Sequence, residues 1–199
     1  MKLEQSFYLN ADVCQVAQDL LGKVLFCKSD GVISGGMIVE TEAYSEKEKA
    51  CHAYNGRRTK RTSTLFERGG TSYVYLCYGM YHLFNVVTNV NGVAEAVLIR
   101  AVEPVQGVEY MVRRRNARRL TPQLTSGPGK LSIALGIGKE DNGLDLSGEK
   151  VWIEEWGISP SVTEFGQTTR VGVDYAGDDA QLPWRFILKG NPYISHKSK

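Results

Sequence analysis

Residues 37–44 read MIVETEAY, an extended run that ends in acids and an aromatic side chain instead of in a turn. Successive side chains of a β-strand alternate between two faces, so Glu40, Glu42 and Tyr44 are expected on one side. Two carboxylates beside a phenol can act as a general base, a metal ligand or half of an acid–base pair. Acidic side chains are also common on solvated surfaces, so the run alone leaves a catalytic site and an exposed strand face open.

The segments around this run have the pattern of antiparallel strands. Residues 23–27 are apolar, the Ser-Asp-Gly sequence at 29–31 favours a hairpin turn, and residues 33–44 return as the strand that carries the acids. An Asn10 or Asp12 cap, followed by apolar side chains at helical spacing, predicts a helix. Further strands are predicted at 94–101, 151–155, 168–173 and 185–189, and further helices from Pro104 and over 131–136.

The length and composition indicate one compact domain over residues 1–199. The start of the chain lacks the apolar segment of a signal peptide, and no apolar run approaches the length of a transmembrane helix. A cytoplasmic protein is therefore expected, nucleoid-associated if its source is bacterial, with no membrane partner. The four cysteines are far apart and form no CxxC pair, which indicates neither a zinc site nor a disulfide framework.

Positive charge is concentrated in two short windows, although the net charge is only +2. Residues 57–61 and 113–119 together hold nine of the 24 lysines and arginines, a density typical of phosphate contact. A solvated helix face is the alternative for the second window. The clusters therefore favour a polyanionic partner without identifying it.

Residues 71–87 have the most unusual composition of the chain, with four tyrosines. They predict two strands that meet at residues 78–81, where Gly79 permits the positive φ of a tight turn. Aromatic side chains at an exposed hairpin tip are unfavourable in water unless they insert into a partner, such as the bases or minor groove of a duplex. Packing of the tyrosines on a neighbouring helix is the alternative.

Two further polar side chains bear on the chemistry. Arg100 falls within the apolar strand 94–101, where a buried arginine needs a partner, and Glu40 or Glu42 can supply the carboxylate. His52 lies close to Glu42 in sequence, which leaves a carboxylate–histidine site open. No second histidine stands at ligand spacing, so no metal site is predicted.

Five motifs give the chain a resemblance to the alkyladenine, or 3-methyladenine, DNA glycosylase family of base-excision repair. They occur in the family's order and extend over nearly the whole chain. The resemblance implies a mixed α/β (α+β) domain around a curved antiparallel sheet, with flanking helices and a protruding aromatic hairpin. The motifs are IVETEAY at 38–44, YVYLCYGMY at 73–81, LIRAVEP at 98–104, SGPGKL at 126–131 and RVGV at 170–173.

The resemblance also implies roles for individual residues at the reacting bond. Glu42 would be the general base that activates the attacking water, and Arg100 and the backbone carbonyl of Val171 would help to hold that water. An extruded base would lie in a pocket lined by aromatic side chains, with an asparagine that disfavours the exocyclic amino group of normal guanine. The implied pocket residues are Tyr44, His52, Tyr75 and Asn85.

For the DNA itself, the resemblance implies that Tyr78 enters the minor groove and fills the space left by the flipped nucleotide. The other implied DNA contacts are Thr59, Arg61, Leu65, Tyr81 and Lys130. No lysine occupies a nucleophile's position in these motifs. The expected enzyme is therefore a monomeric, monofunctional hydrolase without lyase activity, metal or nucleotide cofactor. It would act on 3-methyladenine, 7-methylguanine, hypoxanthine or ethenoadenine in double-stranded DNA.

Two other classes of function remain as alternatives at this point. A metal-dependent nuclease or phosphoesterase could use Glu40, Glu42 and His52, and a chelator would then abolish its activity. A non-catalytic nucleic-acid-binding domain would need only the aromatic hairpin and the basic loops. In that case, Glu42→Gln would change nothing measurable.

Overall fold

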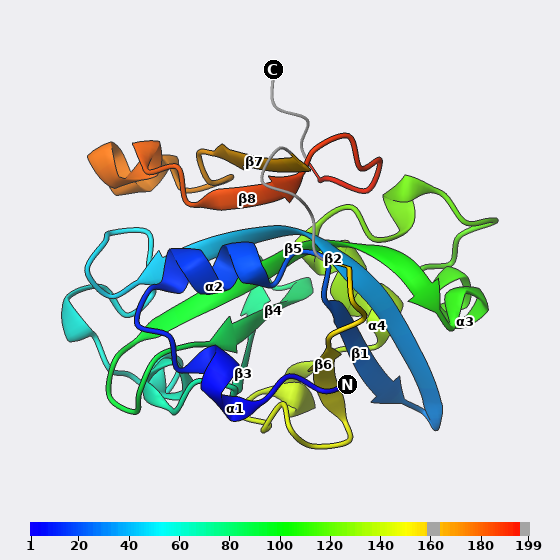
Figure 1. Cartoon of the computed structure of the whole chain (residues 1–199), viewed down its shortest axis with the longest axis horizontal. Coiled ribbons are helices and arrows are strands. Elements are labelled where there is room, and N and C mark those ends of the chain that lie inside the picture. The colour runs from blue at the N-terminus through cyan, green and yellow to red at the C-terminus, as the bar shows by residue number, and fades with distance from the viewer. Residues whose placement is uncertain (159–163, 196–199) are drawn as a thin grey trace.

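The computed structural model describes residues 1–158 and 164–195 (Figure 1). The helices are α1 (Gln5–Tyr8), α2 (Val13–Asp19), α3 (Val108–Arg114) and α4 (Pro128–Leu135), and the 3₁₀ turns are η1 (Tyr54–Gly56), η2 (Ser63–Phe66), η3 (Pro122–Leu124), η4 (Lys139–Asp141) and η6 (Asp174–Gln181). The strands are β1 (Val24–Ser29), β2 (Val32–Ser45), β3 (Ser72–Cys77), β4 (Tyr81–Val87), β5 (Glu95–Gln106), β6 (Val151–Glu154), β7 (Phe165–Thr168) and β8 (Arg185–Leu188).

Within the described residues, eight strands form one antiparallel sheet organised around β2. Strand β5 pairs along one edge of β2, and β4 and β3 continue outward from β5. On the other edge, residues 32–37 of β2 pair with β1 and residues 40–42 pair with β8. Pairing with β5 is irregular between Ile38 and Thr41, and such bulges bend and twist a strand. The sheet curves along β2, as Figure 1 shows, so the predicted mixed α+β fold is confirmed.

Helix α2 packs on β2 and β5 and decides which way the acids of β2 face. Asp12 caps the helix by accepting hydrogen bonds from two backbone N–H groups of its first turn, as predicted. The hydroxyl of Thr41 donates to the carbonyl oxygen of Ala17 in α2, at 2.7 Å. Because neighbouring strand residues point to opposite faces, Glu40 and Glu42 face away from α2.

Helix α4 packs on β4 and β5, and α3 packs on α4. A small apolar group, here named the η6 cluster, joins the loop after β2 to the segment after β7; it consists of Ala50, Val173, Ala176 and Ala180. This cluster holds two distant segments beside the end of β2. None of the helices in residues 1–158 and 164–195 is long and apolar enough to cross a membrane.

The helix predicted from Pro104 is wrong at its start. Strand β5 continues to Gln106, and Pro104 pairs with Gly36 of β2 beside a register shift, a position where a sheet tolerates proline. Helix α3 begins only after Gly107, whose φ of 66° lies in the left-handed region. The apolar residues after Pro104 therefore extend the sheet instead of forming the first helical turn.

The strand predicted at 168–173 is also misplaced. Strand β7 ends at Thr168, and residues 170–173 form an irregular segment in which Gly172 has a φ of 77°. Its backbone groups make contacts other than those of a β-ladder, since the N–H of Val171 donates to a side chain. The motif at 170–173 is thus a loop that approaches β2.

The aromatic hairpin is confirmed. Strands β3 and β4 pair from Ser72 to Cys77, and the turn between them contains Tyr78 and Gly79 at φ values of 50° and 69°. The backbone N–H of Met80 donates to the carbonyl of Cys77 at 3.1 Å and closes the turn. Tyr78 is 87% exposed, so its ring projects from the tip instead of packing on a helix.

Candidate active site

Glu42 is a fully buried carboxylate near the C-terminal end of β2, held by three donors. The backbone N–H of Val171 donates to its Oε1 at 2.7 Å. The hydroxyl of Tyr44 donates to its Oε2 at 2.7 Å, and Nη1 of Arg100 donates to the same oxygen at 3.2 Å. A carboxylate offers about four acceptor positions, so these three donors leave one for a further partner.

Arg100 and Glu40 form an ion pair beside this carboxylate. Nε of Arg100 donates to Oε1 of Glu40 at 2.8 Å, and Nε of Arg185 donates to the same oxygen at 2.8 Å. Burial alone would raise the pKa of Glu40, but Arg100 and Arg185 together with hydrogen bonds from Ser195 hold it below its ordinary value. The sequence predicts a pairing of Arg100 with Glu40 or Glu42, and the structure shows Arg100 paired with both.

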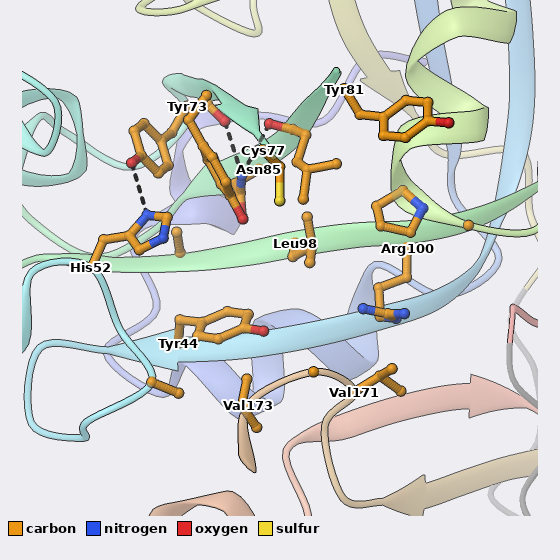
Figure 2. A pocket seen from close by; sticks show the side chains of 18 of the residues that line it. Tyr44, His52, Tyr73, Cys77, Tyr81, Asn85, Leu98, Arg100, Val171 and Val173 are labelled. Carbon is orange, nitrogen blue, oxygen red and sulfur yellow. Dashed lines mark hydrogen bonds between the residues drawn. The ribbon is translucent and has the colours of Figure 1, made fainter. Parts of the chain in front are cut away.

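A cavity of about 760 Å³ opens in front of Tyr44, Arg100 and Val171 (Figure 2). We call it the base cavity. It is lined by the end of β2 and the segment that follows it, the aromatic hairpin, β5, the start of α4, the 171–175 segment and Ser195. The structure places eleven of the thirteen predicted site residues on its lining: Tyr44, His52, Arg61, Leu65, Tyr75, Tyr78, Tyr81, Asn85, Arg100, Lys130 and Val171.

One wall of the base cavity is a group of rings from β3 and the loop after β2. The ring centroids of His52 and Tyr75 are 4.6 Å apart with the planes nearly perpendicular, and those of Tyr73 and Tyr75 are 5.4 Å apart. The guanidinium of Arg61 lies 5.3 Å from the centre of the Tyr75 ring. The sequence analysis missed Tyr73, although its spacing of two from Tyr75 places both on one strand face.

His52 is a neutral imidazole in this wall. Its Nδ1 lies 3.0 Å from the hydroxyl of Tyr73. Burial, reinforced by the nearby positive charge of Arg61, lowers the pKa of His52 to about 4. Burial raises the pKa of Tyr73 to about 12, so the phenol keeps its proton at neutral pH. Apart from the guanidinium of Arg61, the wall therefore presents aromatic faces and uncharged hydrogen-bonding groups.

We expect the imidazole of His52 to titrate near pH 4 instead of near its ordinary value of 6.5. Between these two values the unfolded chain binds a proton that the folded chain does not, so folding stability should decrease as pH falls through this window. The measurement is an NMR titration of the histidine Cε1–H signals. The signal of His52 is assigned as the one that is missing from the spectrum of His52→Gln. A midpoint above pH 6 would contradict the buried neutral state.

Asn85 and Tyr44 complete the inner surface of the base cavity. Nδ2 of Asn85 donates to the backbone carbonyls of Tyr73 and Leu83 at 3.0 and 3.3 Å, which fixes the amide in β4. The guanidinium of Arg170 lies 4.9 Å from the centre of the Tyr44 ring. These contacts hold both side chains in place. Figure 2 shows Asn85 and Tyr44 on opposite sides of the cavity.

The predicted DNA contacts lie mainly at the rim. Tyr81 packs against Gly129 of α4, and Lys130 donates to Oε1 of Gln123 at 2.5 Å. Thr59 lies outside the base cavity and lines a second, smaller one. Leu65 is only 3% exposed and belongs to an internal apolar cluster. Little of its surface is therefore accessible to DNA, and its predicted DNA contact stays a prediction.

A buried ion pair supports the 170–173 loop, and the sequence did not indicate it. Both guanidinium Nη atoms of Arg170 donate to the carboxylate of Glu48 at 2.8 Å, and Arg170 also donates to the backbone carbonyls of Ala43 and Asp179 at 3.0 Å. Since Val171 directly follows Arg170 in the chain, this ion pair fixes the position of the Val171 backbone N–H that donates to Glu42. The 122-residue separation of Glu48 and Arg170 explains why no local pattern revealed it.

Within residues 1–158 and 164–195, no group of three or more His, Cys, Asp or Glu side chains could hold a metal ion. The three residues considered for a metal-dependent nuclease have other partners. Glu40 binds two arginines, Glu42 accepts from Val171, Tyr44 and Arg100, and His52 is turned toward Tyr73. The observed arrangement is that of a buried carboxylate, Glu42, which does not itself line the base cavity but is bonded to three residues that do.

Comparison with known proteins gives matches over nearly the whole chain. The methylpurine-DNA glycosylase (MPG) family matches residues 6–192. A protein of Alkaliphilus oremlandii named "Putative 3-methyladenine DNA glycosylase" is 47% identical over 205 residues, covering 99% of this chain and 100% of the relative. Proteins of the same name are 47% identical in Chlamydia pneumoniae, with 94% of each chain covered, and 46% identical in Clostridium botulinum, with 99% of this chain and 100% of the relative covered.

Proposed function

Since the chain belongs to the methylpurine-DNA glycosylase family, we propose that it flips damaged purines out of duplex DNA and hydrolyses their N-glycosidic bond. The observation that carries this proposal is the buried Glu42 carboxylate just behind the lining of the base cavity. Three lining residues, Tyr44, Arg100 and Val171, donate to it and leave one acceptor position. A base inside a duplex is out of reach of a nucleophile, so it must leave the stack to react. DNA glycosylase activity is common to the family, whereas the role of Glu42 is our proposal.

In the proposed step, a water bound at the remaining acceptor position of Glu42 attacks C1′ of the extruded nucleotide. Glu42 takes a proton from the water, a C1′–O bond forms, and the N-glycosidic bond breaks with its electron pair on the base. The developing positive charge of the sugar is stabilised by the ionised carboxylate. Val171, Tyr44 and Arg100 fix the carboxylate by the contacts described above, and the step uses neither a metal nor a cofactor.

The lining of the base cavity supports alkylated purines as the substrates. A purine alkylated at N3 or N7 is positively charged, and the faces of Tyr44 and Tyr75 attract cations. The same positive charge makes the purine a good leaving group, so it needs no added proton. His52 is neutral and therefore does not repel such a base. We propose 3-methyladenine and 7-methylguanine as substrates, with hypoxanthine and ethenoadenine as neutral substrates.

The partner in this proposal is double-stranded DNA, and the enzyme acts as a cytoplasmic monomer. Tyr78, at the hairpin tip, would fill the gap that the extruded nucleotide leaves in the duplex.

Tyr78→Ala is expected to slow base release roughly tenfold where the lesion is well paired, since a stacked aromatic side chain contributes ~1–3 kcal/mol. The loss should be smaller for a mispaired lesion, because a mispaired base leaves the stack more readily. The measurement is single-turnover release of hypoxanthine opposite cytosine, with which it forms a Watson–Crick pair, and opposite a mismatched base. Equal losses on both duplexes would contradict the proposed wedge.

The proposal as a whole is tested by base release from duplex oligonucleotides that contain each lesion, with a chelator present. Free base together with an alkali-labile site is the expected result. Direct strand cleavage that the chelator abolishes would instead favour a metal-dependent nuclease. Tight binding without release of any of the four bases would favour a binding domain.

A further inference from the structure

Tyr175 stands where the base cavity meets a second cavity of different character. It lines both the base cavity and the neighbouring cavity of about 360 Å³. The two cavities also share His52 and Arg61, so they lie next to each other at this point. The second cavity is polar and positively charged, with side chains that include Lys49, Arg57, Thr59, Arg61 and Thr62.

The position of Tyr175 is fixed although the residue is 71% exposed. Its neighbours Val173 and Ala176 are buried in the η6 cluster, which holds the backbone on both sides. The hydroxyl of Tyr175 donates to the carbonyl oxygen of Ala50 at 3.1 Å and joins η6 to the loop after β2. The hydroxyl is therefore occupied, and what Tyr175 offers to a ligand is the face of its ring.

This inference rests on the proposed function, in which a nucleotide is extruded from the duplex. The two cavities then suit chemically different parts of that nucleotide. The purine suits the aromatic base cavity, and the adjacent phosphate suits the cavity that carries Lys49, Arg57 and Arg61. The deoxyribose joins purine and phosphate, so it must lie at the junction of the cavities. We propose that Tyr175 binds the deoxyribose of the extruded nucleotide against the face of its ring and so opposes return of the nucleotide to the stack.

This position differs from that of Tyr78. Tyr78 projects from the hairpin tip at the rim and would occupy the duplex, whereas Tyr175 is anchored to the wall that the nucleotide passes on its way in. Loss of Tyr78 should make flipping harder to start. Loss of Tyr175 should lower the fraction of nucleotide that stays flipped.

The test compares Tyr175→Ala, Tyr175→Phe and the natural protein. Tyr175→Ala should lower single-turnover release of hypoxanthine roughly tenfold, the scale of one lost aromatic contact, and should lower the fluorescence of extrahelical ethenoadenine in the complex. Tyr175→Phe keeps the ring and should retain most of both signals. Tyr110→Ala, at a half-buried tyrosine of α3 that lines neither cavity, is the matched control and should leave both unchanged.

Two further measurements distinguish this role of Tyr175 from a contribution to folding stability or to nonspecific DNA binding. The thermal midpoint of Tyr175→Ala should match that of the natural protein, because the ring is largely exposed. Its affinity for undamaged duplex should also be unchanged. An equal loss of affinity for damaged and undamaged DNA, or natural rates and fluorescence in Tyr175→Ala, would overturn the role of Tyr175 and leave the proposed glycosylase function intact. If the natural protein releases no base, the role of Tyr175 and the proposed function are both overturned.

Discussion

Glu42→Gln is expected to lower the single-turnover rate of base release about 10³-fold, within the range of 10²–10⁴ typical for loss of a general base. The amide cannot accept the proton of the attacking water and carries no charge to stabilise the sugar. Lesion binding should persist, because the aromatic wall and the rim are untouched. The measurement is release of hypoxanthine from duplex DNA, with binding followed separately by ethenoadenine fluorescence.

This variant should also be less stable, by about 1–3 kcal/mol, because one buried acceptor is exchanged for a donor. If the amide oxygen keeps the bond from Val171, its NH₂ group faces the hydroxyl of Tyr44 and Nη1 of Arg100. Rates must therefore be compared at a temperature where both proteins are folded. Glu109→Gln makes the same charge change at an exposed position of α3 and should leave activity unchanged. Natural rates of release in folded Glu42→Gln would exclude Glu42 as the base.

Features decided by local chemistry were predictable from the sequence. The Asp12 cap, the Ser-Asp-Gly hairpin and the aromatic hairpin each depend on neighbouring residues, and each is present. Alternation along β2 placed Glu40 and Glu42 on one face, and the apolar setting of Arg100 identified it as their partner. A buried charge requires a counter-charge, so this pairing followed from composition.

Features decided by distant contacts were not predictable. Pro104 has the pattern of a helix start, but pairing with Gly36 keeps it in β5, because tertiary contacts override local preference. The 170–173 loop has the β-branched and apolar residues of a strand, yet its backbone turns to contact Glu42. In the candidate site, the support of the loop by Glu48 and the pairing of Arg185 with Glu40 join residues more than 100 positions apart.

Glu48→Gln is expected to destabilise the fold by about 3–5 kcal/mol, the scale for removing one partner of a buried ion pair. The Arg170 side chain is fully buried, and both of its Nη atoms donate to Glu48 at 2.8 Å. A neutral amide can accept only one of these bonds and leaves the guanidinium charge uncompensated. The measurement is the free energy of unfolding from urea denaturation at neutral pH.

Glu46→Gln is the matched control, since Glu46 lies two positions away in the same loop and is half-buried. Among the residues that the structure describes, its carboxylate accepts a single long bond, from the N–H of Ala94 at 3.4 Å. Its change in stability should stay below about 1 kcal/mol. Because Val171 follows Arg170, the folded fraction of Glu48→Gln should also release base more slowly than the natural protein. If Glu48→Gln unfolds at the same urea concentration as Glu46→Gln, the ion pair does not hold the loop, and the contact between Val171 and Glu42 must depend on the η6 cluster instead.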